Sequence, residues 1–546
     1  MSVDTSAAEA WLAQDPDPQT RAELSALLDA ARAGDAAAAA DLADRFSGRL
    51  EFGTAGLRGE LGAGPMRMNR VLVAQAAAGL ARHLLARDSH PSVVIGWDGR
   101  HNSDVFARDS AELLAGAGVA VTMLPRMLPT PVLAFAVRHL DASAGIMVTA
   151  SHNPPRDNGY KVYLGGADAG SQIVPPADAE IAAAIAQVAA GSIVELPRSD
   201  DYATADEGVL DAYVARTAAL AETTAPLRWV YTPMHGVGLE TTRLVAAAAG
   251  FPAPIVVAEQ ADPDPDFPTV AFPNPEEPGA TDLALALARA ERADLVIAND
   301  PDADRVAVAV PDADGWRQLS GNEVGWLLGA RAAERAESGT LACSLVSSPA
   351  LGAIAAAEGL DFVETLTGFK WISRAPDLVF GYEEALGYLV DPDKVRDKDG
   401  ISALVAVLTL FAELREQGIS LAEHLDRFAE RFGGFASAQI SIRVDDLDVI
   451  ARTIARLRAE PPAEIGGVPV ESVDDFATGV GDYPRADILR YRLAGGARVI
   501  VRPSGTEPKL KCYLDAAYAE GGAAERWAGA RATVARLEAG MRELLA

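Results

Sequence analysis

Cysteine is nearly absent from this chain: only Cys343 and Cys512 occur among its 546 residues. Neither lies in a C-x-x-C or Cys/His spacing, so the sequence predicts neither a disulfide framework nor a thiolate metal site. Such low usage fits a reducing compartment. Residues 1–19 carry acidic side chains where a secretory signal carries basic ones, and they contain no continuous apolar segment. We therefore expect a cytoplasmic protein.

Long apolar runs and excess positive charge are lacking as well. The most apolar helix candidate, residues 403–412, is shorter than the roughly 20 residues that span a bilayer. The 48 lysines and arginines are outnumbered by 77 aspartates and glutamates, which gives a net charge of −29. This charge repels polyphosphate backbones and anionic membranes. We therefore expect neither nucleic acid nor a membrane as a partner.

The residues that are present indicate a folded protein of several domains. Hydrophobic residues make up 49% and charged residues 23% of the chain, close to the average of soluble globular proteins. The length corresponds to three or four domains. Lysine is rare, and the few lysines lie beside glycine-containing turns. Either these turns need a compact, titratable ammonium group, or the placement is due to chance. The lysines are Lys161, Lys370, Lys394, Lys398, Lys509 and Lys511.

The order of sequence patterns predicts an α/β protein. Helical spacing of Ala, Leu, Asp and Arg predicts a helical N-terminal extension over residues 1–48. A strand, a helix and a second strand then recur three times, which indicates three β-α-β units. The strand pairs are 93–98 with 119–124, 229–233 with 255–259, and 341–346 with 362–366. Each unit continues to a third strand, at 145–151, 295–300 and 378–384.

The ends of these third strands carry the polar motifs. Ligands of open α/β sheets gather beyond the carboxyl ends of strands, so three related domains can direct these loops into one central cleft. The last part of the chain alternates strands with two amphipathic helices, which predicts an α+β domain. We expect domain 1 with a serine loop, domain 2 with a metal loop, domain 3 with a sugar loop and domain 4 with a phosphate loop. Their ranges are 49–205, 206–321, 322–431 and 436–546.

The first motif, residues 149–154 (Thr-Ala-Ser-His-Asn-Pro), places a hydroxyl on a turn that leaves a buried strand. With His152 and Lys161 nearby, Ser151 can attack phosphorus or carry a phosphoryl group. The alternative is a helix-capping serine in an Asn-Pro turn. Acyl transfer fits less well, because no G-x-S-x-G elbow surrounds Ser151.

The second motif spaces three carboxylates, Asp300, Asp302 and Asp304, at every other residue. A tight loop can direct all three at one hard cation, for which Mg²⁺ is the natural candidate. An EF-hand is excluded, because Arg305 stands where that loop requires glycine. A solvated acidic loop is the alternative. The similar Asp-Ala-Asp-Gly sequence at 312–315 is predicted to be a hairpin turn.

A third motif, residues 501–509, combines a guanidinium, two hydroxyls and a glycine, a set that suits a phosphate dianion. A polar β-turn is the alternative. The segment 236–241 imitates a dinucleotide fingerprint, but its third glycine is replaced by Thr241. We interpret that segment as a structural turn.

Four motifs in this order resemble the α-D-phosphohexomutases, a family of phosphosugar mutases, and the resemblance covers residues 53–513. The motifs are Thr-Ala-Ser-His-Asn-Pro at 149–154, Asp-Pro-Asp-Ala-Asp-Arg at 300–305, Gly-Tyr-Glu-Glu-Ala-Leu-Gly at 381–387 and Arg-Pro-Ser-Gly-Thr-Glu-Pro at 502–508. The resemblance implies four domains around one cleft. It also implies a phosphoserine at Ser151 and Mg²⁺ held by Asp300, Asp302 and Asp304 with the Ser151 phosphate.

The same resemblance implies that Glu383 binds sugar hydroxyls. The phosphate that is not transferred would be bound by Arg502, Ser504, Gly505 and Thr506. Further substrate-binding candidates on the same loops are Arg305, Thr367, Lys370, Glu384 and Lys509. Many hexomutases carry serine where this chain has Ala385. The Glu-Glu-Ala form resembles the branch that contains phosphoglucomutase 2 and phosphopentomutase.

The expected enzyme is a phosphosugar mutase whose leading substrate pair is glucose 1-phosphate and glucose 6-phosphate. It would need a sugar 1,6-bisphosphate as activator. Pentose or mannose phosphates, a phosphoserine-dependent phosphatase, and a catalytically silent sugar-phosphate sensor are the alternatives. For proton transfer we favour Lys161, with His152 second; nearby cations such as Arg58 would help a buried lysine lose its proton. The sequence predicts no oligomeric state.

Overall fold

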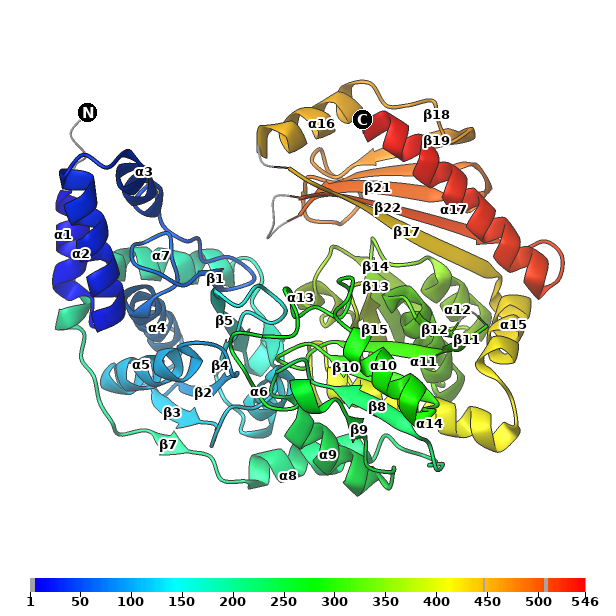
Figure 1. Ribbon diagram of the computed structural model, residues 1–546, viewed down its shortest axis with the longest axis horizontal. Helices are drawn as coiled ribbons and strands as arrows, with labels where there is room; N and C mark the ends of the chain where they lie inside the picture. The colour runs from blue at the N-terminus through cyan, green and yellow to red at the C-terminus, as the bar shows by residue number, and fades with distance from the viewer. Residues whose placement is uncertain (1–4, 314, 445–446, 505–508, 546) are drawn as a thin grey trace. The chain divides into compact units, whose positions relative to one another are not determined.

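The computed structural model describes residues 5–313, 315–444, 447–504 and 509–545 (Figure 1). The chain forms two compact units. The first comprises residues 1–319 together with 387–409, and the second comprises residues 320–386 together with 410–546. Each unit is described by itself below.

The first unit begins with three helices, drawn in dark blue in Figure 1: α1 (Ser6–Gln14), α2 (Pro18–Arg32) and α3 (Ala36–Arg45). Aspartates cap two of them, because the Asp17 carboxylate accepts the Gln19 amide and the Asp35 carboxylate accepts the Ala37 amide. Their apolar residues, including Trp11, form a core cluster with residues of α4 (Arg70–Leu85). The helices expected within residues 1–48 are therefore present.

The first α/β domain contains one mixed sheet. Its remaining elements are β1 (Leu57–Glu60), β2 (Ser92–Trp97), α5 (Ser103–Gly116), β3 (Ala120–Met123), α6 (Thr130–His139), β4 (Ala144–Val148), β5 (Asp157–Leu164), η1 (Gly166–Asp168), β6 (Ser171–Gln172), α7 (Ala177–Ala189), η2 (Ile193–Glu195) and β7 (Ala203–Thr204). The strand order is β1-β5-β4-β2-β3-β7. Strand β2 is parallel to β3 and β4, as the β-α-β pattern predicts, whereas β5 runs antiparallel to β4.

The second α/β domain repeats this plan. Its elements are α8 (Gly208–Ala218), β8 (Trp229–Thr232), α9 (Gly238–Ala249), β9 (Ile255–Val256), η3 (Ala258–Gln260), α10 (Asp282–Glu291), β10 (Leu295–Asn299), β11 (Val306–Asp312) and β12 (Gly315–Gln318). The strand order is β12-β11-β10-β8-β9, and β8 is parallel to β9 and β10. Strands β11 and β12 form the hairpin expected at 312–315.

The segment 387–409 returns to the first unit with β16 (Gly387–Leu389) and the start of α14 (Gly400–Gln417). Buried polar contacts fix it there. The Lys394 ammonium donates to the Thr217 hydroxyl at 2.6 Å, and the Tyr213 hydroxyl donates to the Asp399 carboxylate at 2.7 Å. The Tyr163 hydroxyl donates to Asp397 at 2.9 Å.

The third α/β domain lies in the second unit. It contains α11 (Gly321–Arg335), β13 (Thr340–Ser344), α12 (Ala350–Glu358), β14 (Asp361–Thr365), α13 (Phe369–Ile372) and β15 (Leu378–Glu383). Strand β13 is parallel to both β14 and β15. A reciprocal capping box between Ser320 and Glu323 starts α11.

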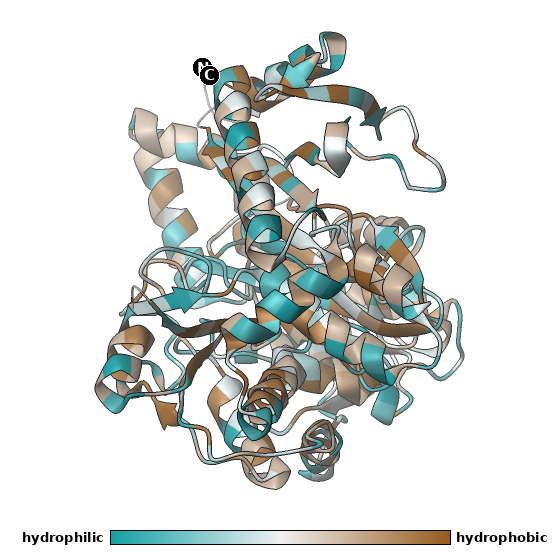
Figure 2. Cartoon of the chain, turned by 90° about the vertical axis from the view of Figure 1, so that its right-hand side faces the viewer, coloured by the Kyte–Doolittle hydropathy of each residue, from teal (hydrophilic) through white to brown (hydrophobic). Residues whose placement is uncertain are grey.

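The C-terminal domain follows the end of α14 and α15 (Leu421–Phe432). Its elements are β17 (Gly434–Arg443), α16 (Leu447–Ala459), β18 (Glu464–Ile465), β19 (Val468–Asp475), β20 (Leu489–Leu493), η4 (Ala494–Gly496), β21 (Arg498–Pro503), β22 (Lys509–Tyr518) and α17 (Ala523–Leu545). The sheet order is β17-β22-β21-β20-β19-β18, all antiparallel. Helix α17, below the mark C in Figure 2, alternates hydrophilic and hydrophobic bands because one face packs on β17 and β22.

The architecture confirms the expected fold class of three related α/β domains followed by an α+β domain. The common cleft stays a prediction. Among the helices that the structure describes, none is both long enough and apolar enough to cross a membrane.

Candidate active site

The loop between β10 and β11 carries Asp300, Asp302 and Asp304, all fully buried. A neighbouring turn fixes its path: a Cβ on Gly236 would lie 2.3 Å from the Pro301 Cα, and the Val237 amide donates to the Pro301 carbonyl at 2.8 Å. Glycine is therefore required at 236 for close packing against this loop. This packing agrees with the interpretation of the 236–241 segment as a structural turn, which stays a prediction.

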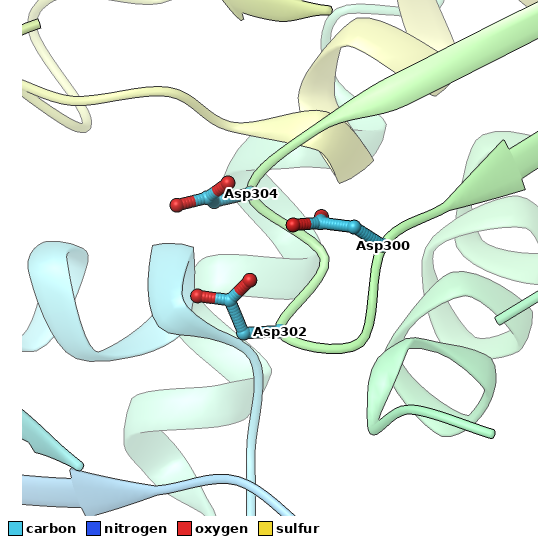
Figure 3. Close-up of side chains that lie close together, drawn as sticks. All are labelled: Asp300, Asp302 and Asp304. Atoms are coloured by element: carbon cyan, nitrogen blue, oxygen red, sulfur yellow. The ribbon is translucent and has the colours of Figure 1, made fainter. Parts of the chain in front are cut away.

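The three carboxylates turn to the same side of the loop (Figure 3), and their ligand atoms lie within 4.8 Å of one another. One oxygen each of Asp302 and Asp304 is buried without a hydrogen-bond partner among the described residues. Buried, unpaired carboxylate oxygens are costly unless a cation binds them. This donor set fits a hard divalent cation such as Mg²⁺.

Ser151 follows β4 and lies beside this group. Its hydroxyl donates to the Asp300 carboxylate at 2.7 Å and is 3.2 Å from Nδ1 of His152. The backbone of Ser151 has φ of +52°, in the left-handed region that residues with a Cβ rarely adopt. Its amide donates to the Thr149 hydroxyl at 2.8 Å. The nucleophile candidate and the metal candidates are thus in direct contact.

Several cations surround the aspartates. Lys161 lies on β5, whose pairing with β4 returns it to the strand end, and its ammonium is 2.8 Å from Asp302 and 2.9 Å from Asp304. The Lys398 ammonium is 3.3 Å from Asp304. The backbone amide of Arg305 donates to Asp300 at 3.0 Å. These contacts offset the cost of burying three carboxylates close together.

Arg58 joins the same site from β1. Its guanidinium donates to the Asn153 side chain at 3.1 Å, two residues beyond Ser151. Its charge also acts on Asp302, Asp304 and Arg305. The first unit therefore brings together eight of the predicted residues: Arg58, Ser151, His152, Lys161, Asp300, Asp302, Asp304 and Arg305.

Burial and charge set the protonation of these groups. Burial, reinforced by Arg305 and Arg58, lowers the pKa of His152 well below its usual value, so its imidazole is neutral near pH 7. Burial together with Asp302 and Asp304 raises the pKa of Asp300 well above its usual value. Burial disfavours the Lys161 ammonium, but Asp302 and Asp304 outweigh it and raise the Lys161 pKa. The two carboxylates thus keep Lys161 protonated, and the expectation that nearby cations such as Arg58 would help it lose its proton is wrong.

The predicted sugar loop lies in the second unit. Glu383 is the last residue of β15 and is half-buried. The Glu384 carboxylate accepts hydrogen bonds from Ser344 at 3.1 Å and Ser347 at 3.3 Å, so it holds the loop in place. Thr367 follows β14, and Lys370 lies on α13; both are half-buried.

The predicted phosphate loop follows β21 in the same unit. One terminal guanidinium nitrogen of Arg502 donates to the Tyr513 hydroxyl at 3.3 Å, while its Nε is buried with no hydrogen-bond partner among the described residues. The Ser504 amide donates to the Lys509 carbonyl at 2.8 Å. Gly505 and Thr506 lie outside the described residues. A half-buried guanidinium whose buried Nε has no partner among the described residues suits an anionic ligand.

Sequence reasoning missed two residues that hold this site. The Thr130 hydroxyl donates at 2.6 Å to Oδ2 of Asp302, the same oxygen that accepts from the Lys161 ammonium. Arg100 donates to carbonyls of the Ser151 loop, including that of Ser151 itself at 2.7 Å. Arg100 follows the carboxyl end of β2, so the rule that places ligands beyond strand ends was a usable signal. Thr130 carries no comparable signal.

Comparison with known proteins agrees with this arrangement. Four consecutive segments match the phosphoglucomutase/phosphomannomutase α/β/α domains I, II and III and the C-terminal domain, at residues 49–191, 211–315, 320–432 and 441–533. A protein of Haemophilus influenzae named probable phosphomannomutase is 58% identical over 455 residues, which is 83% of this chain and 93% of that protein.

Two further proteins extend the comparison. The phosphopentomutase of Mus musculus is 35% identical over 566 residues, covering 92% of this chain and 89% of that protein. The crystal structure of a phosphoglucomutase/phosphomannomutase family protein from Burkholderia thailandensis shares the fold, with a TM-score of 0.69, 21% identity, and coverage of 90% of this chain and 96% of that chain. The chain therefore belongs to the phosphoglucomutase/phosphomannomutase family of α-D-phosphohexomutases, and it is a phosphosugar mutase.

Proposed function

We propose that this mutase exchanges 1-phospho and terminal-phospho isomers of an aldose through Ser151, with glucose 1-phosphate and glucose 6-phosphate as the leading pair. The observation that carries the proposal is the contact of the Ser151 hydroxyl with Asp300 inside a cluster of three aspartates. A nucleophile beside a site for a hard cation is the arrangement that phosphoryl transfer requires. The cytoplasmic location expected from the sequence is part of the proposal.

In the proposed reaction, phospho-Ser151 donates its phosphoryl group to the free hydroxyl of the sugar phosphate. The bond from the Ser151 oxygen to phosphorus breaks as the bond to the sugar oxygen forms, which leaves a sugar bisphosphate. After this intermediate turns end for end, the Ser151 hydroxyl attacks the other phosphoryl group. A sugar 1,6-bisphosphate would accordingly serve as activator, since it phosphorylates an empty Ser151.

The three aspartates would hold Mg²⁺, which offsets the charge spread over the moving phosphoryl group. Arg58 and Arg305 add fixed positive charge beside it. Lys161 is the proposed proton donor to the Ser151 oxygen as the phosphoryl group leaves, and it recovers the proton that the attacking sugar hydroxyl releases. Neutral His152, 3.2 Å from that oxygen, is the second candidate for proton transfer.

A Lys161→Ala variant should lose about 10²–10⁴-fold in kcat, the usual cost of removing a general acid or base. The substitution also removes the ammonium group that contacts both Asp302 and Asp304. Initial rates at saturating Mg²⁺ measure it, with Lys511→Ala on β22 as the matched control. Near-normal turnover of Lys161→Ala would exclude Lys161 from proton transfer.

An Arg502→Lys variant should keep the charge but lose the planar fork that grips a phosphate through two nitrogens. We expect kcat/KM for phosphosugars to fall by about 10²-fold, equivalent to about 2.7 kcal/mol. Phosphorylation of Ser151 by a small phosphoryl donor should change little, because that step needs no distal grip. Wild-type kinetics in Arg502→Lys would show that the C-terminal domain does not bind the phosphate.

A panel of glucose, mannose, ribose and deoxyribose 1-phosphates tests the substrate. Pentose is the second candidate, because Ala385 stands where many hexomutases carry serine. The proposal expects the highest kcat/KM for glucose 1-phosphate, and a higher value for another sugar would reassign the substrate. Free phosphate is measured in the same assay: release equal to isomer formed would indicate the phosphatase alternative, and no turnover on any sugar would favour the silent sensor.

A further inference from the structure

One buried arginine gathers the loop that carries Ser151. Arg100 is 4% exposed, and its two terminal nitrogens donate to four carbonyls between residues 151 and 157. One nitrogen donates to the carbonyls of Ser151, at 2.7 Å, and Asn153. The other donates to those of Pro154, at 2.8 Å, and Asp157, at 3.1 Å. A single planar group thus fixes both ends of the loop.

The conformation of the loop makes such a clamp necessary. The left-handed backbone of Ser151, with φ of +52°, is unfavourable for a residue with a Cβ and persists only where the surroundings impose it. The bond from Arg100 to the Ser151 carbonyl acts on this same residue. The direction of the Ser151 hydroxyl, and hence its contact with Asp300, follows from that backbone conformation.

Arg100 is itself held from other directions. The Asp98 carboxylate accepts the Arg100 amide at 3.0 Å and the Ser103 hydroxyl at 2.7 Å, which fixes the turn after β2. The guanidinium carbon lies 4.9 Å from the ring centroid of Phe267, a residue of the second domain. The clamp therefore has little freedom to move away from the loop.

We propose that Arg100 is a positioning residue for phosphoryl transfer, which keeps Ser151 in its strained, attack-ready conformation without touching the reacting atoms. The inference rests on the proposed role of Ser151. Lysine cannot replace it, because one ammonium nitrogen cannot reach four carbonyls along two edges of a plane.

The test compares Arg100→Lys with Arg156→Lys, the same change at an arginine within the loop that Arg100 holds. Arg156 is exposed, and its side chain pairs with Glu60 at the surface. We expect Arg100→Lys to lower kcat about 10²-fold, because a displacement of about 1 Å at a reacting group costs that much, with KM within about threefold of wild type. Hydrogen exchange of the amides at 152, 153, 156 and 157 should be faster in Arg100→Lys alone.

Each outcome supports or overturns the proposed role of Arg100. Unchanged kcat in folded Arg100→Lys overturns the proposal, whether or not exchange is faster. A lower melting temperature with wild-type kcat and exchange shows a purely structural role and also overturns it. If Ser151→Ala retains turnover, the proposed function fails instead; the exchange comparison then still decides whether Arg100 holds the loop.

Discussion

Replacing Ser151 with alanine is expected to lower turnover by at least about 10⁴-fold, the largest effect of any single change in this chain. Alanine has no oxygen to carry the phosphoryl group, so both half-reactions stop. The fold should survive, because the side chain loses only its hydrogen bonds to Asp300 and His152. One such bond contributes about 1 kcal/mol.

The turnover rate and the intact mass check this expectation. Incubation with glucose 1,6-bisphosphate should add one phosphoryl group to wild type, as seen in the intact mass, and none to Ser151→Ala. Ser47→Ala is the control, since Ser47 is exposed and, among the described residues, its hydroxyl bonds to one nearby backbone carbonyl. Full turnover in Ser151→Ala, or a phosphoryl group found on another residue, would contradict the assignment.

The second large effect is expected from Asp300→Asn. The change removes one of three carboxylates that face the proposed cation and leaves a neutral side chain of the same shape. We expect kcat at saturating Mg²⁺ to fall about 10³-fold, equivalent to about 4 kcal/mol of lost transition-state stabilisation. Mg²⁺ should raise the melting temperature of wild type but not of the variant.

In EDTA the variant should melt no lower than wild type, because burial and the neighbouring Asp302 and Asp304 disfavour a charged Asp300. Asp312→Asn is the matched control: Asp312 belongs to a similar Asp-x-Asp sequence, but it is the exposed last residue of β11. Equal dependence on Mg²⁺ in Asp300→Asn and wild type would show that the cluster does not hold the metal.

The sequence predicted the parts of the site whose residues lie close together both in the sequence and in the structure. Asp300, Asp302 and Asp304 occupy one loop, so their spacing alone indicated a cation site. The strand pattern likewise predicted a β-α-β unit at 93–124, and β2 is parallel to β3 as such a unit requires.

Contacts between distant residues were not predictable in this way. Thr130 meets Asp302 across 172 positions of the chain, and Arg100 meets Ser151 across 51. Nothing near Thr130 distinguishes its hydroxyl from one that caps a helix. The return of residues 387–409 to the first unit also has no local signal, since it depends on partners such as Tyr163 and Tyr213.

Because residues 387–409 belong to the first unit, this unit cannot finish folding early during synthesis on the ribosome. The first unit cannot be completed when residue 319 emerges, because β16, Lys398 and the start of α14 are not yet synthesised. At about 5–20 residues per second, the intervening chain takes on the order of 5–20 s to appear. During that interval Asp304 lacks Lys398, and the partners of Tyr163 and Tyr213 are missing. A nascent chain stalled before residue 387 therefore presents an unfinished, acidic pocket to chaperones and proteases.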